Sequence, residues 1–130
     1  MLDVQGVDRI SVPAVPEAVP ADLKKQVSAS LASEQIIFLD FHRHPESDAV
    51  YLSMLVPIFD MQNNQPLGVL ILRINPNVYL YPFLQTWPVP SESAETLLVR
   101  LDGQKALFLN SLRFQSDAAL NLRFTLNETE

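Results

Sequence analysis

The chain has 130 residues, of which 48% are hydrophobic, and it carries a formal net charge of −6. That length and apolar content are typical of one folded domain and exclude an intrinsically disordered chain. The nine Lys and Arg residues are scattered, so nucleic acid is not an expected partner. Cysteine is absent, which excludes thiol catalysis, Cys-ligated zinc and disulfides.

The first part of the chain predicts a hairpin, a connector and a helix. In residues 2–12, hydrophobic residues alternate with polar ones on both sides of Gly6, as in a β-hairpin. Residues 13–20 contain three prolines, which indicate a stiff connector without regular structure. Residues 21–33 carry a stripe of apolar residues at every fourth position, which predicts an amphipathic helix.

Three strands are predicted next, at residues 35–43, 49–59 and 67–74. All three are apolar on both faces, so each face should be covered at least in part. The short loop rich in Asn and Gln between the second and third strands predicts an antiparallel hairpin. Pro57 has no backbone N–H, so it should lie at a bulge or on the unpaired side of an edge strand.

The last part of the chain predicts a helix, a second hairpin and a final strand. The helix should start with Asn75 as its N-cap and Pro76 at its first position, and Pro82 should kink or restart it. Asp102-Gly103 lies between two apolar runs, which predicts a hairpin with a type I′ turn. A strand around residues 120–126 completes an α+β fold with an antiparallel sheet.

Five short motifs stand out between Asn75 and Phe114. They are an aromatic residue with Leu-Tyr-Pro, then Trp-Pro, Ala-Glu-Thr-Leu-Leu-Val-Arg, Asp-Gly and Phe-Leu-Asn-x-Leu-Arg, at residues 79–82, 87–88, 94–100, 102–103 and 108–113. This stretch resembles the extracytoplasmic sensory region of bacterial membrane-bound signalling proteins, of the PAS-like or Cache type. The upstream stretches IFLDFHR and QPLGVLILRI are similar to the central strands of that family.

The resemblance implies a PAS/Cache-like antiparallel sheet with flanking helices. It also implies a periplasmic sensory domain, excised from a longer protein that is anchored in the inner membrane. Such regions precede GGDEF diguanylate cyclase, EAL phosphodiesterase or histidine kinase domains, and a diguanylate cyclase is the expected effector. The fragment itself is expected to have neither enzyme activity nor a cofactor. Two alternatives stay open: a dimerisation or interaction module without a ligand, and a cytosolic PAS domain that binds a cofactor.

A likeness between the two predicted hairpins, residues 2–12 and 99–109, suggests a division of the chain in which each hairpin opens a module. Residues 1–75 are expected to form the sensor module, and residues 76–94 a kinked helix and connector. Residues 95–130 are expected either to begin a second, truncated module or to add strands to the first. The joint between the modules is predicted to consist of four residues, Tyr79, Tyr81, Pro82 and Trp87. Its aromatic side chains could line a pocket, although packing is their commoner role.

Arg73 is the sharpest candidate for ligand binding, because a guanidinium at the end of an apolar strand needs a partner or a place at the rim. Cache-like sensors bind small carboxylates through Arg, Tyr and Asp. The resemblance therefore implies a pocket for a small carboxylate-type ligand near four residues, Asp40, His42, Tyr51 and Arg73. The alternative is that Arg73 forms a structural ion pair, for example with Asp60 across the hairpin. A homodimer is a second candidate partner.

Metal binding and catalysis are weighed and not predicted. Asp40, His42 and His44 alternate along a strand, and two His with a carboxylate can bind a divalent metal. Pro45 follows at once, which favours a strand end that enters a polar loop, so no metal site is predicted. The sequence contains neither a Gly-x-Ser-x-Gly motif nor a glycine-rich phosphate loop, and catalysis within this chain is not expected.

Overall fold

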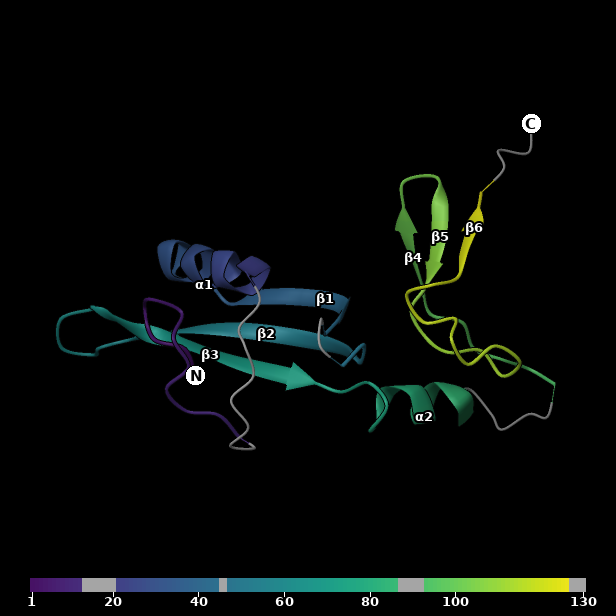
Figure 1. The fold of residues 1–130 in the computed structure, drawn as a ribbon, viewed down its shortest axis with the longest axis horizontal. Helices are drawn as coiled ribbons and strands as arrows, with labels where there is room; N and C mark the ends of the chain where they lie inside the picture. Colours follow the sequence, from purple (N-terminus) through teal and green to yellow (C-terminus); the bar gives the residue numbers. More distant parts are fainter. Residues whose placement is uncertain (13–20, 45–46, 87–92, 127–130) are drawn as a thin grey trace. The chain divides into compact units, whose positions relative to one another are not determined.

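The structure, a computed structural model, describes residues 1–12, 21–44, 47–86 and 93–126 (Figure 1). In chain order the described elements are α1 (Ala21–Ser33), β1 (Ile37–Arg43), β2 (Val50–Phe59), β3 (Pro66–Ile74), α2 (Leu80–Thr86), β4 (Val99–Asp102), β5 (Lys105–Phe108) and β6 (Arg123–Thr125). The strands form two three-stranded antiparallel sheets, β1-β2-β3 and β4-β5-β6. The predicted α+β class is thus confirmed. No helix in the described ranges is both long enough and apolar enough to cross a membrane.

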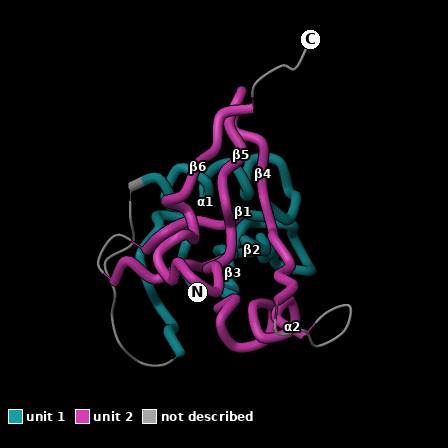
Figure 2. Tube along the Cα trace, turned by 90° about the vertical axis from the view of Figure 1, so that its right-hand side faces the viewer, with its two compact units in different colours: residues 1–40, 52–74 teal, residues 41–51, 75–130 magenta. Residues whose placement is uncertain are grey.

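The chain divides into two compact units (Figure 2). Unit 1 consists of Met1–Asp40 and Leu52–Ile74, and unit 2 consists of Phe41–Tyr51 and Asn75–Glu130. Unit 2 therefore takes in the connection between β1 and β2 together with α2 and the second sheet. The predicted proline-rich connector, residues 13–20, lies outside the described residues.

Unit 1 is built around a small apolar core. Four side chains form its buried centre: Leu2, Val27, Leu55 and Val69. Leu23 and Leu31 of α1 pack on this cluster, so the apolar stripe of the predicted helix is the face that it buries against the sheet. Ile37 and Leu39 of β1 and Ile71 of β3 complete the same layer. The helix and the three strands were therefore predicted correctly, to within two residues at each end.

The chain reverses near Gly6, as predicted, but the predicted hairpin is reduced to one isolated antiparallel bridge. Leu2 makes an isolated bridge to Asp8, and the Asp3 carboxylate accepts hydrogen bonds from the backbone of Gln5 and Val7, at 2.9 Å each. Leu2 also pairs with β3, where its N–H and carbonyl bond to Val69 at 2.9 and 2.8 Å. Local alternation predicted the reversal but not this second pairing, because the partner lies far along the chain.

Gly68 makes that pairing sterically possible. A Cβ at this position would lie 2.2 Å from the carbonyl oxygen of Leu2, and the glycine has a φ of +155°, which other residues rarely adopt. Only a residue without a side chain lets the first segment approach β3 so closely. Leu2 is buried as a result, with 4% of its surface exposed.

Pro57 is tolerated inside the central strand. It lies opposite Val69 in the β2–β3 register, and Val69 directs both of its backbone hydrogen bonds to Leu2. The Pro57–Val69 pair therefore needs no N–H from the proline. A register shift lies close by, between Ile58 and Phe59. The prediction placed Pro57 at a bulge or on an edge strand; instead it lies at a regular position of the central strand, beside a bulge.

In unit 2, α2 begins later than predicted. Residues 76–79 form turns, and the Asn75 side chain accepts a hydrogen bond from the Asn77 N–H at 3.0 Å. The helix starts at Leu80, so Pro82 falls in its first turn, where backbone N–H groups have no partner inside the helix. The predicted helix start at Asn75 is therefore wrong, and Pro82 does not need to kink or restart the helix.

The second hairpin forms where it was predicted, but with a different turn. Asp102 pairs with Lys105, which leaves Gly103 and Gln104 as the two loop residues. Gly103 has a φ of +62°, and Gln104 is not among the residues with positive φ. A type I′ turn needs positive φ at both positions, whereas glycine at the first position alone is typical of type II′. The predicted final strand is confirmed as β6, which pairs with β5.

Candidate functional site

Arg43, at the end of β1, links the β1–β2 connection to the distant segment around Ala119 in unit 2. Its side chain lies on the same face of β1 as Phe41, two residues earlier. One terminal nitrogen donates to the carbonyl oxygen of Asp48 at 3.0 Å and forms an ion pair with the Asp48 carboxylate at 3.1 Å. The other donates to the carbonyl oxygen of Ala119 at 2.6 Å. A guanidinium suits this position because its donors are spread over one rigid plane.

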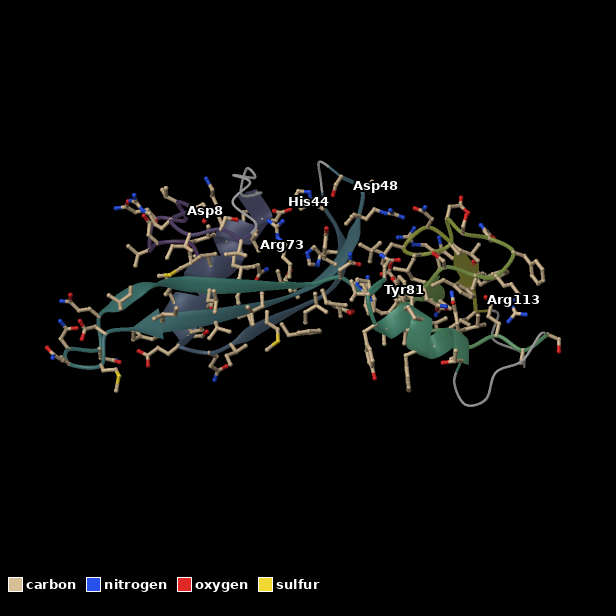
Figure 3. All side chains as sticks on the ribbon, turned by 90° about the horizontal axis from the view of Figure 1, so that it is seen from below. Asp8, His44, Asp48, Arg73, Tyr81 and Arg113 are labelled. Carbon is tan, nitrogen blue, oxygen red and sulfur yellow. The ribbon has the colours of Figure 1, made fainter. Side chains whose placement is uncertain are left out.

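Tyr81, on α2, is the second anchor of this region (Figure 3). Its ring stacks on Phe41 with 6.4 Å between the ring centres, and its hydroxyl donates to the carbonyl oxygen of Leu109. Burial raises the pKa of Tyr81 to about 12, although the positive charge of Arg43 acts in the opposite direction. The phenol is therefore neutral at physiological pH, and it can act only as a hydrogen-bonding group.

Arg43 and Tyr81 line a cavity of about 270 Å³ that lies entirely within unit 2. Asp48, Ala49 and Val50 supply one part of its wall from the β1–β2 connection and the start of β2. The rest of the wall is mainly polar and includes Asn77, Ser111, Ser116, Asp117 and Asn121. Arginine, amide and hydroxyl groups around one space can bind a small polar molecule.

The charges of the cavity wall are unequally exposed. The Asp48 side chain is 82% exposed, whereas that of Arg43 is only 29% exposed. The arginine is therefore held in place by the fold, and its carboxylate partner lies largely in water. No histidine, which is the commonest general base, lines the cavity.

The four predicted ligand-binding residues do not form this cavity. In unit 1, Arg73 lies on the face of β3 that carries the core residues Val69 and Ile71, whereas Asp40 lies on the opposite face of β1 from the core residue Leu39. The sheet therefore separates their side chains, and both residues are exposed.

Asp60, the example given as an ion-pair partner for Arg73, is wrong. The register places Arg73 opposite Ser53, while Asp60 lies beyond the other end of the β2–β3 hairpin.

The other two predicted residues belong to unit 2. His42 follows Phe41 on β1 and is half-buried. Tyr51 is also half-buried and meets the ring of His44 edge-on, with 6.3 Å between the ring centres. No group of three His, Asp or Glu side chains in the described ranges could hold a metal ion.

The predicted joint residues have different surroundings. Tyr81 is buried, whereas Tyr79 is 73% exposed and stacks on Phe83 with 5.9 Å between the ring centres. Pro82 is exposed on α2. Trp87 lies outside the described residues.

Some residues of the motifs shared with PAS or Cache sensors, at residues 94–100 and 108–113, bond to backbone groups. The Asn110 side chain is buried, accepts from the Leu98 N–H at 2.7 Å and donates to the Thr96 carbonyl oxygen at 3.2 Å. The Glu95 carboxylate accepts from the Arg113 N–H. These side chains hold the approach to β4 against the segment that follows β5. They shape the unit rather than the cavity.

Arg43 was missed by sequence reasoning, although it lies beside the predicted His42. The available signal was a charged residue at the end of an apolar strand, on the same face as Phe41. The same reasoning was applied to Arg73. What distinguishes the two arginines is Ala119, which approaches Arg43 only in the folded chain.

The chain was also compared with known proteins. No protein-family model, no curated protein and no solved structure matches it. The likeness to PAS or Cache sensors therefore rests on the sequence motifs alone, and the two sheets support it only at the level of an α+β fold.

Proposed function

We propose that this chain is a sensory module of the PAS/Cache type that binds a small carboxylate-bearing ligand in the cavity of unit 2. The observation that carries the proposal is the position of Arg43 in the cavity wall. Its guanidinium is fixed by the carbonyl oxygen of Ala119, and its carboxylate partner, Asp48, is exposed. The sequence motifs supply the expected context, a periplasmic region of a membrane-anchored signalling protein. A diguanylate cyclase is the expected effector in that context, and a histidine kinase is the alternative.

Arg43 can exchange one carboxylate for another at low cost. An ion pair between two exposed groups contributes about 0–1 kcal/mol. Here only the Asp48 carboxylate lies largely in water, so Asp48 is released at low cost provided that the ligand carboxylate takes its place at the half-buried guanidinium. A ligand carboxylate that enters the cavity can form two parallel hydrogen bonds with the guanidinium, the strongest geometry that arginine offers. Asn77 and Ser111 lie in the same wall and can bond to the rest of the ligand.

The size and charge of the cavity restrict the ligand. About 270 Å³ lies slightly below the usual range for drug-sized ligands, so a metabolite of a few carbon atoms fits best. Asp48 and Asp117 together carry two negative charges against the one positive charge of Arg43. A ligand with several negative charges would therefore be repelled. A monocarboxylate with neutral or positively charged substituents is favoured.

The same exchange offers a route for a signal. Without ligand, Arg43 binds both the backbone and the side chain of Asp48, which ties the β1–β2 connection to the guanidinium. A ligand that replaces the Asp48 carboxylate weakens this tie. Ligand binding then shifts the population of two arrangements of the connection, which the effector detects.

Binding can be tested by calorimetry and thermal unfolding with a panel of small monocarboxylates. We expect at least one to stabilise the protein, by about 2.7 kcal/mol at a concentration of one hundred times its dissociation constant. Arg43→Ala should weaken that binding at least tenfold. Arg123→Ala is the matched control, because Arg123 also pairs with an aspartate in unit 2, at 3.9 Å, but does not line the cavity.

A third variant separates the two arginine sites. If Arg73→Ala abolishes binding and Arg43→Ala does not, the ligand binds at the site predicted around Arg73 and the proposal for unit 2 fails. Absence of stabilisation by every monocarboxylate would favour the alternative of an interaction module without a ligand.

A further inference from the structure

The sheet of unit 1 has a second face that α1 does not cover. Its β2–β3 part consists of cross-strand pairs in which all partners are apolar: Leu52 with Ile74, Met54 with Leu72, Val56 with Leu70 and Ile58 with Gly68. Phe38 of β1 lies on the same side, because it alternates with the core residues Ile37 and Leu39. These residues are called the outer face below.

The outer face is exposed, in contrast to the face that packs on α1. Its most exposed side chains are Phe38, Leu72, Ile74 and Leu70, which have 55%, 45%, 44% and 37% of their surface exposed. On the other face, Leu55 and Val69 are both 0% exposed. Strands that are apolar on both faces normally have both faces covered. A contiguous apolar patch on a water-soluble surface typically marks an interaction site.

We propose that the outer face binds the outer face of a second copy of this chain. Three strands spaced about 4.8 Å apart and rising about 3.3 Å per residue give a footprint of roughly 450 Å² per copy. Two copies then bury roughly 900 Å², which corresponds to a weak and transient dimer with a dissociation constant of about 10 µM or weaker. Two sheets can pack face to face in this way at a spacing of about 10 Å.

A second copy fits this surface better than a charged partner does. The four β2–β3 pairs carry no charge, so this part of the surface offers nothing that would select a basic or acidic partner. Asp40 and His42 follow Phe38 on the same side of β1 and form a polar rim at one edge of the outer face. An identical flat apolar face is self-complementary under a two-fold axis, and each copy then covers the exposed surface of the other. Each chain carries a net charge of −6, so two copies repel at long range. Salt screens that repulsion, and the dimer should become tighter as ionic strength rises.

Sedimentation equilibrium up to about 1 mM protein tests the proposal. We expect concentration-dependent dimers, and we expect Leu72→Glu to raise the dissociation constant at least tenfold, because the dimer would bury a carboxylate. Leu101→Glu is the matched control. Leu101 is 68% exposed on β4 of the other sheet, so its substitution changes charge and surface apolarity in the same way.

Site-specific crosslinking gives a second measurement that does not depend on the stability of the glutamate variants. The chain has no cysteine, so Leu72→Cys and Leu101→Cys each introduce a unique thiol. A short thiol-reactive crosslinker should join two copies through position 72 and not through position 101. This inference goes beyond ligand binding, and neither proposal depends on the other.

Three outcomes would overturn the proposal. A protein that stays monomeric at about 1 mM does not use the outer face for a second copy. Dimers that survive Leu72→Glu but are lost with Leu101→Glu place the interface on the second sheet. Dimers that dissociate as salt is added would be held by charge, contrary to an apolar interface.

Discussion

Leu55 in unit 1 and Asn110 in unit 2 are both buried, at 0% and 5% exposed, yet different forces act on them. Leu55 belongs to an apolar cluster, where the gain comes from removing side chains from water. Asn110 is bonded to backbone groups of residues 96, 98 and 111. Unit 2 has other contacts of this kind, from Arg43 to Ala119 and from Tyr81 to Leu109. Unit 2 also buries apolar side chains, among them Leu107, Phe108 and Leu109. The comparison teaches that packing holds both units, and that unit 2 adds buried side chains that bond to distant backbone groups.

The largest effect is expected in the core of unit 1. Leu55→Ala should lower the free energy of unfolding by about 2–5 kcal/mol, because it removes a fully buried side chain and leaves a cavity. Urea unfolding measures the loss. Leu72→Ala on the outer face is the control and should cost less than half as much in dilute protein. In Leu55→Ala, backbone amide hydrogen exchange should accelerate more in α1, β2 and β3 than in β4 and β5. Equal acceleration in both units would show that the two units do not unfold separately.

Gly68→Ala tests whether the first segment is part of the same core. The new methyl group would clash with the Leu2 carbonyl, so the segment should detach and expose Leu2, at a cost of about 1.5–3 kcal/mol. Leu2→Ala should cost a similar amount. If Gly68→Ala acts through Leu2, the double variant loses much less than the sum of the single losses. Additive losses would show that the strain at Gly68 is independent of Leu2.

Asn110→Ala is the corresponding experiment on unit 2. It leaves the Leu98 N–H without its acceptor and the Thr96 carbonyl without its donor, at a cost of about 1–3 kcal/mol. Asn121→Ala is the control, because Asn121 is exposed and bonds to a carbonyl oxygen only four residues away. Unfolding curves give both losses. Equal losses for the two variants would mean that burying the hydrogen bonds of the asparagine side chain adds nothing to stability.

Local periodicity predicted the parts of this fold that are repeated along the chain. The apolar stripe of α1 and the alternation in β1–β3 are visible in sequence because burial acts on each turn or pair of residues. The loop at Asp3, the pairing of Leu2 with Val69 and the cavity around Arg43 depend on partners far along the chain. The start of α2 was misjudged because Asn-Pro is typical of a helix start, and here it introduces turns instead.

The sequence predicted which types of residue form the candidate site, but not which positions in the chain supply them. Arginine, tyrosine and aspartate were the expected types, and the cavity contains Arg43, Tyr81 and Asp48. The particular residues were different because Arg43 and Arg73 both end apolar strands. Nothing in the local sequence shows which of the two will meet the carbonyl oxygen of Ala119.

Tyr81 gives the smallest expected effect and the one that depends on pH. Tyr81→Phe keeps the stacking on Phe41 and removes only the hydrogen bond to Leu109, so it should cost about 0.5–1.5 kcal/mol. In the folded protein the pKa of Tyr81 is raised from 10.0 to about 12. The folded state therefore holds the phenol proton more tightly than the unfolded state does. The resulting stability is fully present below pH 10 and is lost as pH rises toward 12.

Ultraviolet absorbance of tyrosinate during an alkaline titration checks this expectation. One tyrosine of the folded wild type should ionise late, near pH 12, and Tyr81→Phe should remove that late step. The variant should also lose less stability than the wild type between pH 10 and 12, because it has no phenol at this position to ionise. A late step that survives in Tyr81→Phe would assign it to another tyrosine, and Tyr81 would then not be one of the buried polar groups on which unit 2 depends.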